Sequence, residues 1–537
     1  RSPVKRFFVR SWMIAIGASV ALVGVLSVAR AQDGQGDAGE KASATAPRDA
    51  SSRYEPPVAA ASDEGERAIQ QFRKPEGLAV DLFAAEPLLA NPVAFWIDNR
   101  GQAYVCETFR HHAGVTDNRS HMSWLDDDLA ARTVADRVAM YRKHLGDEFV
   151  TYGQEHDRVR LLRDTDGDGR ADTATVFADG FKNPADGIGA GVLEHQGKVY
   201  FTCIPDLWQL EDRDGDGVAE QRRSLHHGYG VHVAFLGHDL HGLRVGPDGK
   251  LYFSIGDRGL NVTTKEGKHL FVPDTGAVLR CELDGSNMEV FATGLRNPQE
   301  LAFDQYGNLF ADDNNCDKGD HARLVYVVEG GDSGWHMEYQ TIDPPYMGGP
   351  WFAERLWHLP HPGQPAYHVP PVGRIGTGPS GFLFTSGTTL PDRYTNSFIM
   401  CNYAGGRGLE AFKVAPKGAG FEIADYHDFL TPIMATDAEF GPDGKLYVSD
   451  FVNLDWGGKS LGGRVYTVFD KQKVTAPAAL EVKTLFAEGF GKVAAEKLAA
   501  LLDHADQKVR LRAQWELARR NERGRFLAAL KSGGPMA

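Results

Sequence analysis

Two short acidic segments repeat one pattern of carboxylates and glycines. Residues 164–172 read DTDGDGRAD, and residues 212–220 read DRDGDGVAE. Carboxylates at alternate positions can surround a hard cation with oxygen, while glycine permits the sharp turn that this requires. We therefore predict two structural calcium sites, with solvated acidic turns as the alternative. The expected ligands are Asp164, Asp166, Asp168, the carbonyl of Arg170 and Asp172 in the first loop, and Asp212, Asp214, Asp216, the carbonyl of Val218 and Glu220 in the second.

A second group of segments could support proton transfer. These segments are HDLHGLRV (238–245), SIGDRG (254–259), GLRNPQ (294–299) and GGDSGW (330–335). Imidazole titrates near neutral pH, so His238 or His241 with Asp257 could act as a general base. Arg296 and Asn297 could hold a carboxylated cofactor or substrate. In the alternative interpretation these side chains only bond to carbonyls of neighbouring strands.

Two further groups of polar residues could bind metal. A long segment from Glu107 to Asp157 lacks a strand pattern and contains His111, His112 and His121. Segments of this kind are usually functional or disordered, and the histidines could cap a funnel or bind a metal ion. Asn314, Asn315 and Asp317 form the second group. A resemblance to six-bladed propellers with a central catalytic calcium ion implies that these residues could hold such an ion for hydrolysis of a lactone or ester, and we rank this function last.

A turn followed by a short strand recurs along the chain. Each copy has a glycine turn and a short strand led by an aromatic residue, which predicts a β-hairpin. A spacing of about 50 residues is typical of a β-propeller. The fold class is therefore all-β, with a six-bladed propeller over residues 77–470. We expect the two acidic loops to lie on its second and third blades. The copies are found at residues 98–104, 195–200, 246–252, 304–310 and 441–447, with a degenerate sixth between 381 and 403.

The two ends of the sequence have different compositions. Lys5, Arg6 and Arg10 precede an apolar run and the small-residue site Ala29-Arg30-Ala31, which predicts a signal peptide over residues 1–31 and export to the periplasm or cell envelope. Residues 32–76 are rich in Ala, Ser, Asp, Gly and Glu and are expected to form a disordered tether. After Asp470 a helical period predicts paired helices over residues 483–531, similar to part of a HEAT repeat.

Charge and cysteine content narrow the function further. The 537 residues carry a net charge of −14, which argues against a nucleic-acid partner. The five cysteines form no CxxC or CxxCH motif, so neither a zinc ribbon nor a c-type haem is expected within this stretch. Disulfides and buried free thiols both remain open.

The segments from His238 to Gly259, Arg296-Asn297-Pro298 and GGDSGW (330–335) resemble the soluble PQQ-dependent glucose/sorbosone dehydrogenases. From Pro75 onward the chain also resembles the membrane-bound dehydrogenase domain family of planctomycete and verrucomicrobial bacteria. The motifs that carry this second resemblance are ETFR (107–110), RSHM (119–122) and WLDDDL (124–129). Members of that family typically continue into HEAT repeats and a C-terminal c-type cytochrome domain, so the haem c would lie beyond Ala537.

The resemblance implies roles for individual residues. His238 matches the general base of the sugar dehydrogenases, and Arg296 and Asn297 match residues lining their PQQ site. Where those enzymes place a cofactor-binding lysine, this chain has NYAGG (402–406) with Arg407 nearby, and where they place two arginines it has ATDA (435–438). The calcium ligand beside their quinone is matched by Arg323 or its neighbours Asp320 and His321.

Two functions from different classes follow. The first is an exported oxidoreductase, a quinone-dependent sugar or alcohol dehydrogenase that passes electrons to a downstream c-type cytochrome. His238, His241 and Asp257 would serve catalysis, and Arg296, Asn297 and Arg407 would bind the cofactor. The second is a non-catalytic, calcium-stabilised propeller that binds glycans or a protein partner.

Overall fold

The computed structural model describes residues 54–314, 321–337, 368–385, 388–404, 408–452 and 461–533. Six four-stranded antiparallel sheets are arranged in a ring, and their first strands contact one another around a central axis. This confirms the predicted six-bladed β-propeller. Within the described residues, the helices and a few short connections are all that lies outside the blades and one added hairpin.

The blades are numbered in the order of their inner strands. Blade 1 contains β2 (Pro92–Ile97), β3 (Ala103–Glu107), β4 (Asp157–Arg163) and β5 (Thr173–Phe181); blade 2 contains β6 (Gly191–His195), β7 (Lys198–Cys203), β8 (Asp206–Glu211) and β9 (Gln221–His227); blade 3 contains β10 (Leu240–Val245), β11 (Leu251–Ile255), β14 (Gly276–Cys281) and β15 (Glu289–Leu295). Blade 4 contains β16 (Pro298–Phe303), β17 (Leu309–Asp313), β18 (Arg323–Val327) and β19 (Gly373–Arg374); blade 5 contains β20 (Pro379–Phe384), β21 (Phe398–Asn402), β22 (Gly408–Lys417) and β23 (Gly420–Leu430); blade 6 contains β24 (Ala435–Phe440), β25 (Leu446–Asp450), β26 (Arg464–Asp470) and β1 (Leu78–Ala84). The added hairpin is β12 (Leu260–Thr263) with β13 (His269–Val272).

The recurring turns join the first and second strands of each blade. In blade 3, Gly249 has a φ of +80°, a conformation that glycine adopts without strain, and Gly246 N donates to the carbonyl of Lys250. The turn of blade 6 has the same sequence, and Gly441 N donates to the carbonyl of Lys445. Turn chemistry therefore sets the register of these hairpins, and the six copies correspond to the six blades.

Blade 6 closes the ring with strands from both ends of the described chain. Strand β1 pairs with β26, with Leu78 opposite Asp470 and Val80 opposite Val468. Leu78, Val80 and Leu82 are buried in a cluster with apolar residues of blades 5 and 6. The first strand of the chain thus becomes the outermost strand of the last blade.

The segment between β3 and β4 is helical, and it is packed against the propeller. It contains the 3₁₀-helix η1 (Asn118–Trp124), α2 (Leu125–Ala130), α3 (Val134–Leu145) and the 3₁₀-helix η2 (Gly146–Gly153). A capping box between Thr133 and Asp136 begins α3. The buried side chains of Arg137, Met140 and Tyr141 lie on one face of that helix. The segment, which the structure describes throughout, therefore contains no strand, as its sequence indicated, but it is helical and ordered.

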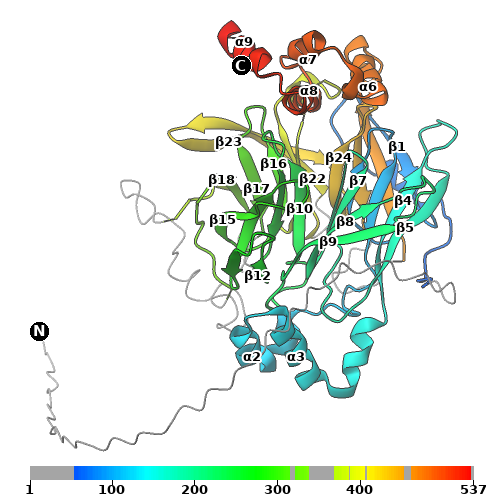
Figure 1. Ribbon diagram of the computed structural model, residues 1–537. Coiled ribbons are helices and arrows are strands. Elements are labelled where there is room, and N and C mark those ends of the chain that lie inside the picture. Colours follow the sequence, from blue (N-terminus) through cyan, green and yellow to red (C-terminus); the bar gives the residue numbers. More distant parts are fainter. Residues whose placement is uncertain are drawn as a thin grey trace, which may run out of the picture. The chain divides into compact units, whose positions relative to one another are not determined.

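Further helices lie at the opposite end of the strands, at the top of Figure 1, whereas α2 and α3 lie at the bottom. They are α6 (Pro477–Glu488), the 3₁₀-helix η5 (Phe490–Lys492), α7 (Ala495–Leu501), α8 (Gln507–Arg519) and α9 (Arg523–Ser532), and η3 (Asp392–Tyr394) is a short 3₁₀-helix in blade 5. Asp506, which immediately precedes α8, caps this helix by accepting from Val509 N.

Part of the predicted tether is ordered. Residues 64–69 form helix α1 (Glu64–Ile69), and Ala68, Ile69 and Phe72 pack against the blade 5–6 cluster. Disorder was predicted from the polar composition of residues 32–76 as a whole, and that prediction was wrong for this part, where a few apolar side chains pack against the propeller. Among the described residues, no helix is long and apolar enough to cross a membrane. Cys106, Cys203, Cys281 and Cys401 are buried free thiols, and Cys316 lies outside the described residues.

Candidate active site

His238, Asp257 and Trp335 form a buried hydrogen-bonded chain. His238 precedes β10, Asp257 follows β11, and Trp335 lies in the turn after β18. The Nδ1 of His238 is 2.6 Å from Oδ1 of Asp257, and the indole Nε1 of Trp335 donates to Oδ2 of Asp257 at 2.9 Å. His238 is 2% exposed and Asp257 is 1% exposed. The predicted pairing of His238 with Asp257 is therefore present in the structure.

The charge of Asp257 determines the tautomer of His238. Burial alone would raise the pKa of Asp257, but His238, Arg296 and Trp335 together hold this pKa below its ordinary value. Asp257 is therefore a carboxylate at neutral pH, and it accepts the proton on His238 Nδ1. This hydrogen bond places the basic lone pair of neutral His238 on Nε2.

Arg296 and Asn297 are fixed by their backbone at the start of β16. Their amides donate to Oδ1 of Asp313 at 2.9 and 2.8 Å, and Asp257 N donates to the carbonyl of Arg296 at 2.7 Å. The guanidinium of Arg296 lies over the rings of Phe235 and Trp335, at 4.9 and 5.7 Å. The structure thus places Arg296 beside the His238–Asp257 pair.

A funnel of about 120 Å³ lies where the inner strands converge. Asn297 lines it and donates from Nδ2 to the carbonyl of Gly237 at 3.2 Å. His241 also lines it, but its Nε2 is 2.9 Å from the carbonyl of Gly237, and burial lowers its pKa to about 4. His241 is therefore a weaker base than a free imidazole and is already engaged.

Two acidic residues of the funnel, Glu300 and Asp437, were not predicted from the sequence as functional residues. Glu300 accepts from Arg244 at 2.7 Å, and burial raises its pKa well above the ordinary value. Asp437 accepts from Phe95 N and Ala438 N, and burial raises its pKa to about 7. Glu300 follows Asn297 by three positions, which was the available signal. Asp437 comes from blade 6, and the available signal was its place in ATDA (435–438), where the sugar dehydrogenases have two arginines.

The described lining of the funnel does not fit a tricarboxylate such as PQQ. Glu300 and Asp437 line it, and no lysine or arginine does so among the described residues. Arg407, predicted to bind the cofactor, lies outside the described residues. Anionic groups need cationic partners in a water-poor site, and the described funnel offers amides and acids in their place.

The predicted calcium position beside a quinone has different chemistry. Arg323 donates from Nε to Oδ2 of Asp313 at 2.9 Å, so this position holds a buried ion pair. His321 Nδ1 is 3.1 Å from the carbonyl of Gly376. Asp320, Asn315 and Asp317 lie outside the described residues. Asn314, the remaining member of the proposed central calcium group, lines the funnel.

The histidines of the helical segment do not form a metal site. His111 lines the funnel, and burial together with His112 lowers its pKa to about 4. His121 stacks on Trp124 with ring centroids 3.8 Å apart. Among the described residues, the His, Cys, Asp and Glu groups close enough to share one cation are the two acidic loops.

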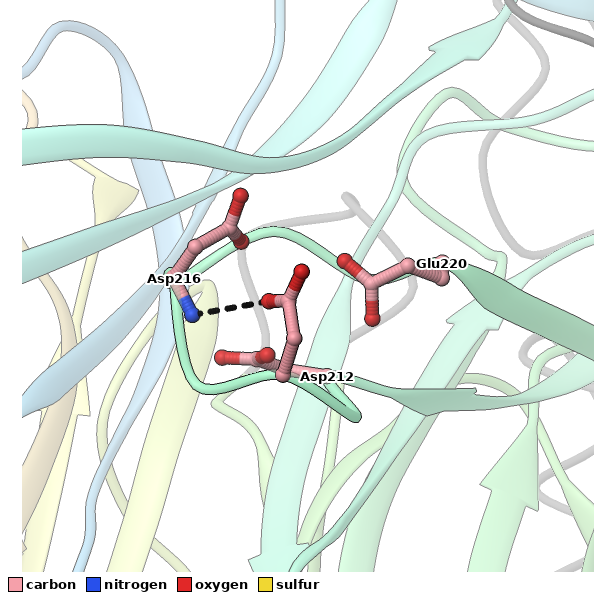
Figure 2. A group of neighbouring side chains, drawn as sticks. Asp212, Asp216 and Glu220 are labelled. Carbon is pink, nitrogen blue, oxygen red and sulfur yellow. Dashed lines mark hydrogen bonds between the residues drawn. The ribbon is translucent and has the colours of Figure 1, made fainter.

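The two acidic loops have the same internal hydrogen bonds. In the second loop, Gly215 N and Gly217 N donate to the two oxygens of Asp212, and Val218 N donates to Asp216. In the first loop, Gly167 N and Gly169 N donate to Asp164 in the same way. Figure 2 shows the carboxylates of Asp212, Asp216 and Glu220 around a common space.

Carboxylate oxygens in each loop lie within 4.8 Å of one another, a geometry that fits a hard cation. The first group is Asp164, Asp166 and Asp172, and the second is Asp212, Asp214, Asp216 and Glu220. The predicted ligand Asp168 is outside the first group, and its Oδ1 accepts from Arg170 N at 2.7 Å, as Asp216 Oδ1 accepts from Val218 N in the second loop.

Each acidic loop also contacts the preceding blade. The first loop joins β4 to β5, and Ala171 N donates at 2.7 Å to the carbonyl of Phe83 in β1. The second joins β8 to β9, and Ala219 N donates at 2.8 Å to the carbonyl of Phe177 in β5. The loops therefore belong to blades 1 and 2. Their expected position on blades 2 and 3 was wrong, because the helical segment lies within blade 1 and not between two blades.

The family model described as Domain of unknown function (DUF7133) matches residues 64–454. The chain belongs to the DUF7133 family. This DUF7133 chain is 32% identical over 123 residues to quinoprotein glucose dehydrogenase B of Acinetobacter calcoaceticus. That alignment covers 17% of the chain and 24% of the relative, so the chain spans about a quarter of the length of the curated relative that it matches. Over this stretch the DUF7133 chain is thus similar to quinoprotein glucose dehydrogenase B.

Solved structures similar to the DUF7133 chain include an oxidoreductase (glucose dehydrogenase) from Thermus thermophilus, with 18% identity, a TM-score of 0.45, and coverage of 73% of this chain and 100% of that one. Another is the PQQ-bound form of aldose sugar dehydrogenase from Streptomyces coelicolor, with 17% identity, a TM-score of 0.41, and coverage of 74% and 100%.

Proposed function

We propose that this protein is an exported oxidoreductase that oxidises a hydroxyl group of a sugar or alcohol. The observation that carries this proposal is the buried His238–Asp257–Trp335 chain, in which a carboxylate orients an imidazole base. The partial similarity to quinoprotein glucose dehydrogenase B supports the same reaction class. We further propose that a c-type cytochrome receives the electrons. In the planctomycete and verrucomicrobial family that the chain resembles, such a domain follows the propeller and HEAT repeats.

His238 would remove the hydroxyl proton of the substrate. Its Nε2 accepts the proton while the carbinol carbon loses a hydride to a separate two-electron acceptor, which leaves a carbonyl product. Asp257 stabilises the imidazolium that forms, and Trp335 fixes the carboxylate through its indole N–H. The described residues thus account for the proton, and the acceptor accounts for the two electrons.

The funnel offers acceptors for substrate hydroxyls. The Oδ1 atoms of Asn297 and Asn314 are buried, and neither has a hydrogen-bond partner among the described residues. Both residues line the funnel. A buried amide oxygen without a partner costs free energy, which a sugar hydroxyl in the funnel would relieve.

One observation favours the non-catalytic alternative. The described lining of the funnel combines amides and apolar side chains with the acids Glu300 and Asp437, and it contains no lysine or arginine. Such a lining suits a neutral glycan better than it suits an anionic quinone. Binding without turnover is therefore the expected result if this alternative holds.

The experiment is dye-linked oxidation of a panel of sugars and alcohols by the whole protein with calcium, with and without added PQQ. The proposal expects turnover of at least one substrate. Saturable binding of a glycan by calorimetry without any turnover supports the alternative. Absence of both turnover and binding contradicts both functions.

We also propose that the two acidic loops bind calcium. Their carboxylates would hold the ion together with the carbonyls of Arg170 and Val218, and each filled loop would stiffen a contact to the preceding blade. In the first loop, Arg170 also donates to the carbonyl of Leu82 and pairs with Glu66 at 2.7 Å, so that site would secure the closing strand β1.

Adding calcium to stripped protein should raise the melting temperature. At a hundredfold excess over the dissociation constant, each site contributes about 2.7 kcal/mol to the free energy of unfolding. The double variant Asp212→Asn/Asp216→Asn should lose one site's share, whereas Asp284→Asn, in an exposed turn, should match the wild type. A melting temperature insensitive to calcium would exclude both sites.

A further inference from the structure

Helix α8 lies across the turns at one end of the propeller (Figure 1). Trp515 Nε1 donates to the carbonyl of Gly246 at 3.1 Å, and Gln514 donates to that of Pro247 at 2.7 Å. Gln507 donates to the carbonyl of Asp304 at 2.7 Å. The helix is thus fixed to the turns of blades 3 and 4 by side chains that reach backbone carbonyls.

A cavity of about 150 Å³ remains between α8 and these turns. Its walls include the aromatic side chains of Trp96, Phe303, Phe384, Phe440 and Trp515. A cavity of about this size accommodates one benzene-sized ring. The cavity lies at the turn end of the blades, whereas the funnel lies where β10 and β16 begin.

The acidic groups at this cavity already have partners. Glu439 accepts from Lys508 Nζ at 2.6 Å and lies 3.9 Å from Arg244 NH1. Asp98 accepts from Arg100 Nε at 3.0 Å and from backbone amides of its turn. Asp506 caps α8 and accepts from Thr388 at 3.1 Å. These carboxylates therefore have little capacity to bind a cationic ligand.

The basic side chains at the cavity, Arg512 and Lys508, do not use all of their hydrogen-bond donors within the described residues. A guanidinium has five N–H donors, yet among the described residues Arg512 makes one hydrogen bond, from NH2 to Asn99 Oδ1 at 3.3 Å. No carboxylate of the described residues lies within ion-pair distance of it. Lys508 uses two of its three donors, on Glu439 and on the carbonyl of Phe440.

The helix brings these donors together with an aromatic wall. Lys508, Arg512 and Trp515 are four and three residues apart, so they lie on one face of α8. The guanidinium carbon of Arg512 is 5.7 Å from the centre of the Trp515 ring. The ring centroid of His195 is 5.4 Å from that of Trp515, and His195 stays neutral because burial and Arg512 lower its pKa to about 3.

We propose that this cavity is a second binding site, for a small aromatic carboxylate. The ring would lie between Trp96 and Trp515, and the carboxylate would accept from Arg512 and the third donor of Lys508. Guanidinium–carboxylate pairing in a partly buried aromatic site is a favourable interaction. The inference does not depend on the activity proposed for the funnel.

Benzoate is the probe, titrated into the whole protein by calorimetry and by tryptophan fluorescence. We expect saturable binding, with weaker binding of neutral benzyl alcohol and of acetate, because each lacks half of the recognised group. Arg512→Gln should weaken benzoate binding by about tenfold or more. Arg519→Gln, an exposed arginine of the same helix, should bind as the wild type does.

Arg512→Lys is the control for misfolding of α8, because it keeps the positive charge at this position. It should bind benzoate with an affinity between those of the wild type and Arg512→Gln. The proposal is overturned if millimolar benzoate shows no saturable binding, if benzyl alcohol binds equally well, or if Arg512→Gln binds benzoate like the wild type.

Discussion

Replacing Asp257 with asparagine should lower kcat for hydroxyl oxidation on the order of 10³- to 10⁴-fold, with a small change in KM. The cause is geometric. The indole N–H of Trp335 donates to one oxygen of Asp257, so the amide oxygen of the introduced asparagine would keep that bond and its NH₂ would face Nδ1 of His238. That arrangement places the imidazole proton on Nε2, the atom that must accept the substrate proton.

The double variant Asp257→Asn/Trp335→Phe provides the control. Without the indole N–H, the amide can turn its oxygen toward His238 Nδ1 and restore the productive tautomer. We expect kcat of the double variant to exceed that of Asp257→Asn. Equal rates in wild type and Asp257→Asn, measured by steady-state kinetics, would show that Asp257 does not orient the base.

Replacing Arg110 with methionine should lower the free energy of unfolding by about 3–5 kcal/mol. Arg110 is 0% exposed. Its guanidinium donates to five backbone carbonyls at 3.0–3.3 Å, those of Gly114, Tyr152, Glu155, Asn183 and Asp186. Its removal leaves these buried acceptors without their donors and releases both ends of the helical segment between β3 and β4.

Urea unfolding measures this effect, with Arg100→Met as the matched variant. The Arg100 side chain is 70% exposed, and its pairing with Asp98 should contribute less than about 1 kcal/mol. Hydrogen exchange should also rise over residues 114–156 in Arg110→Met. A loss similar to that of Arg100→Met would show that Arg110 does not hold the segment.

The propeller could be predicted because its signals are local. The Gly-Pro-Asp-Gly turns at 246–249 and 441–444 fix hairpin geometry within a few residues, and their recurrence gives the blade count. The boundaries of the blades were harder to predict from the sequence. The acidic loops were assigned one blade too late because the segment between β3 and β4 interrupts a blade and resembles a spacer.

The candidate site could be predicted only where its residues are close in sequence or carry a family motif. His238 and Asp257 flank one hairpin, and the structure brings them to 2.6 Å. Trp335, in the GGDSGW segment, reaches Asp257 from the neighbouring blade 4. Asp437 enters the funnel from blade 6, far from His238 in sequence, and this proximity depends on closure of the ring. Helix α3 has a local signal in the sequence, the capping box between Thr133 and Asp136, although this helix was not predicted.

The most direct test compares His238→Gln with His241→Gln in the dye-linked assay. Both histidines are buried near the start of β10, so the two variants are matched in position. We expect His238→Gln to lower the turnover rate by at least about a hundredfold, whereas His241→Gln should keep most of the wild-type rate. Full activity in His238→Gln, or loss confined to His241→Gln, would contradict the assignment of His238 as the base.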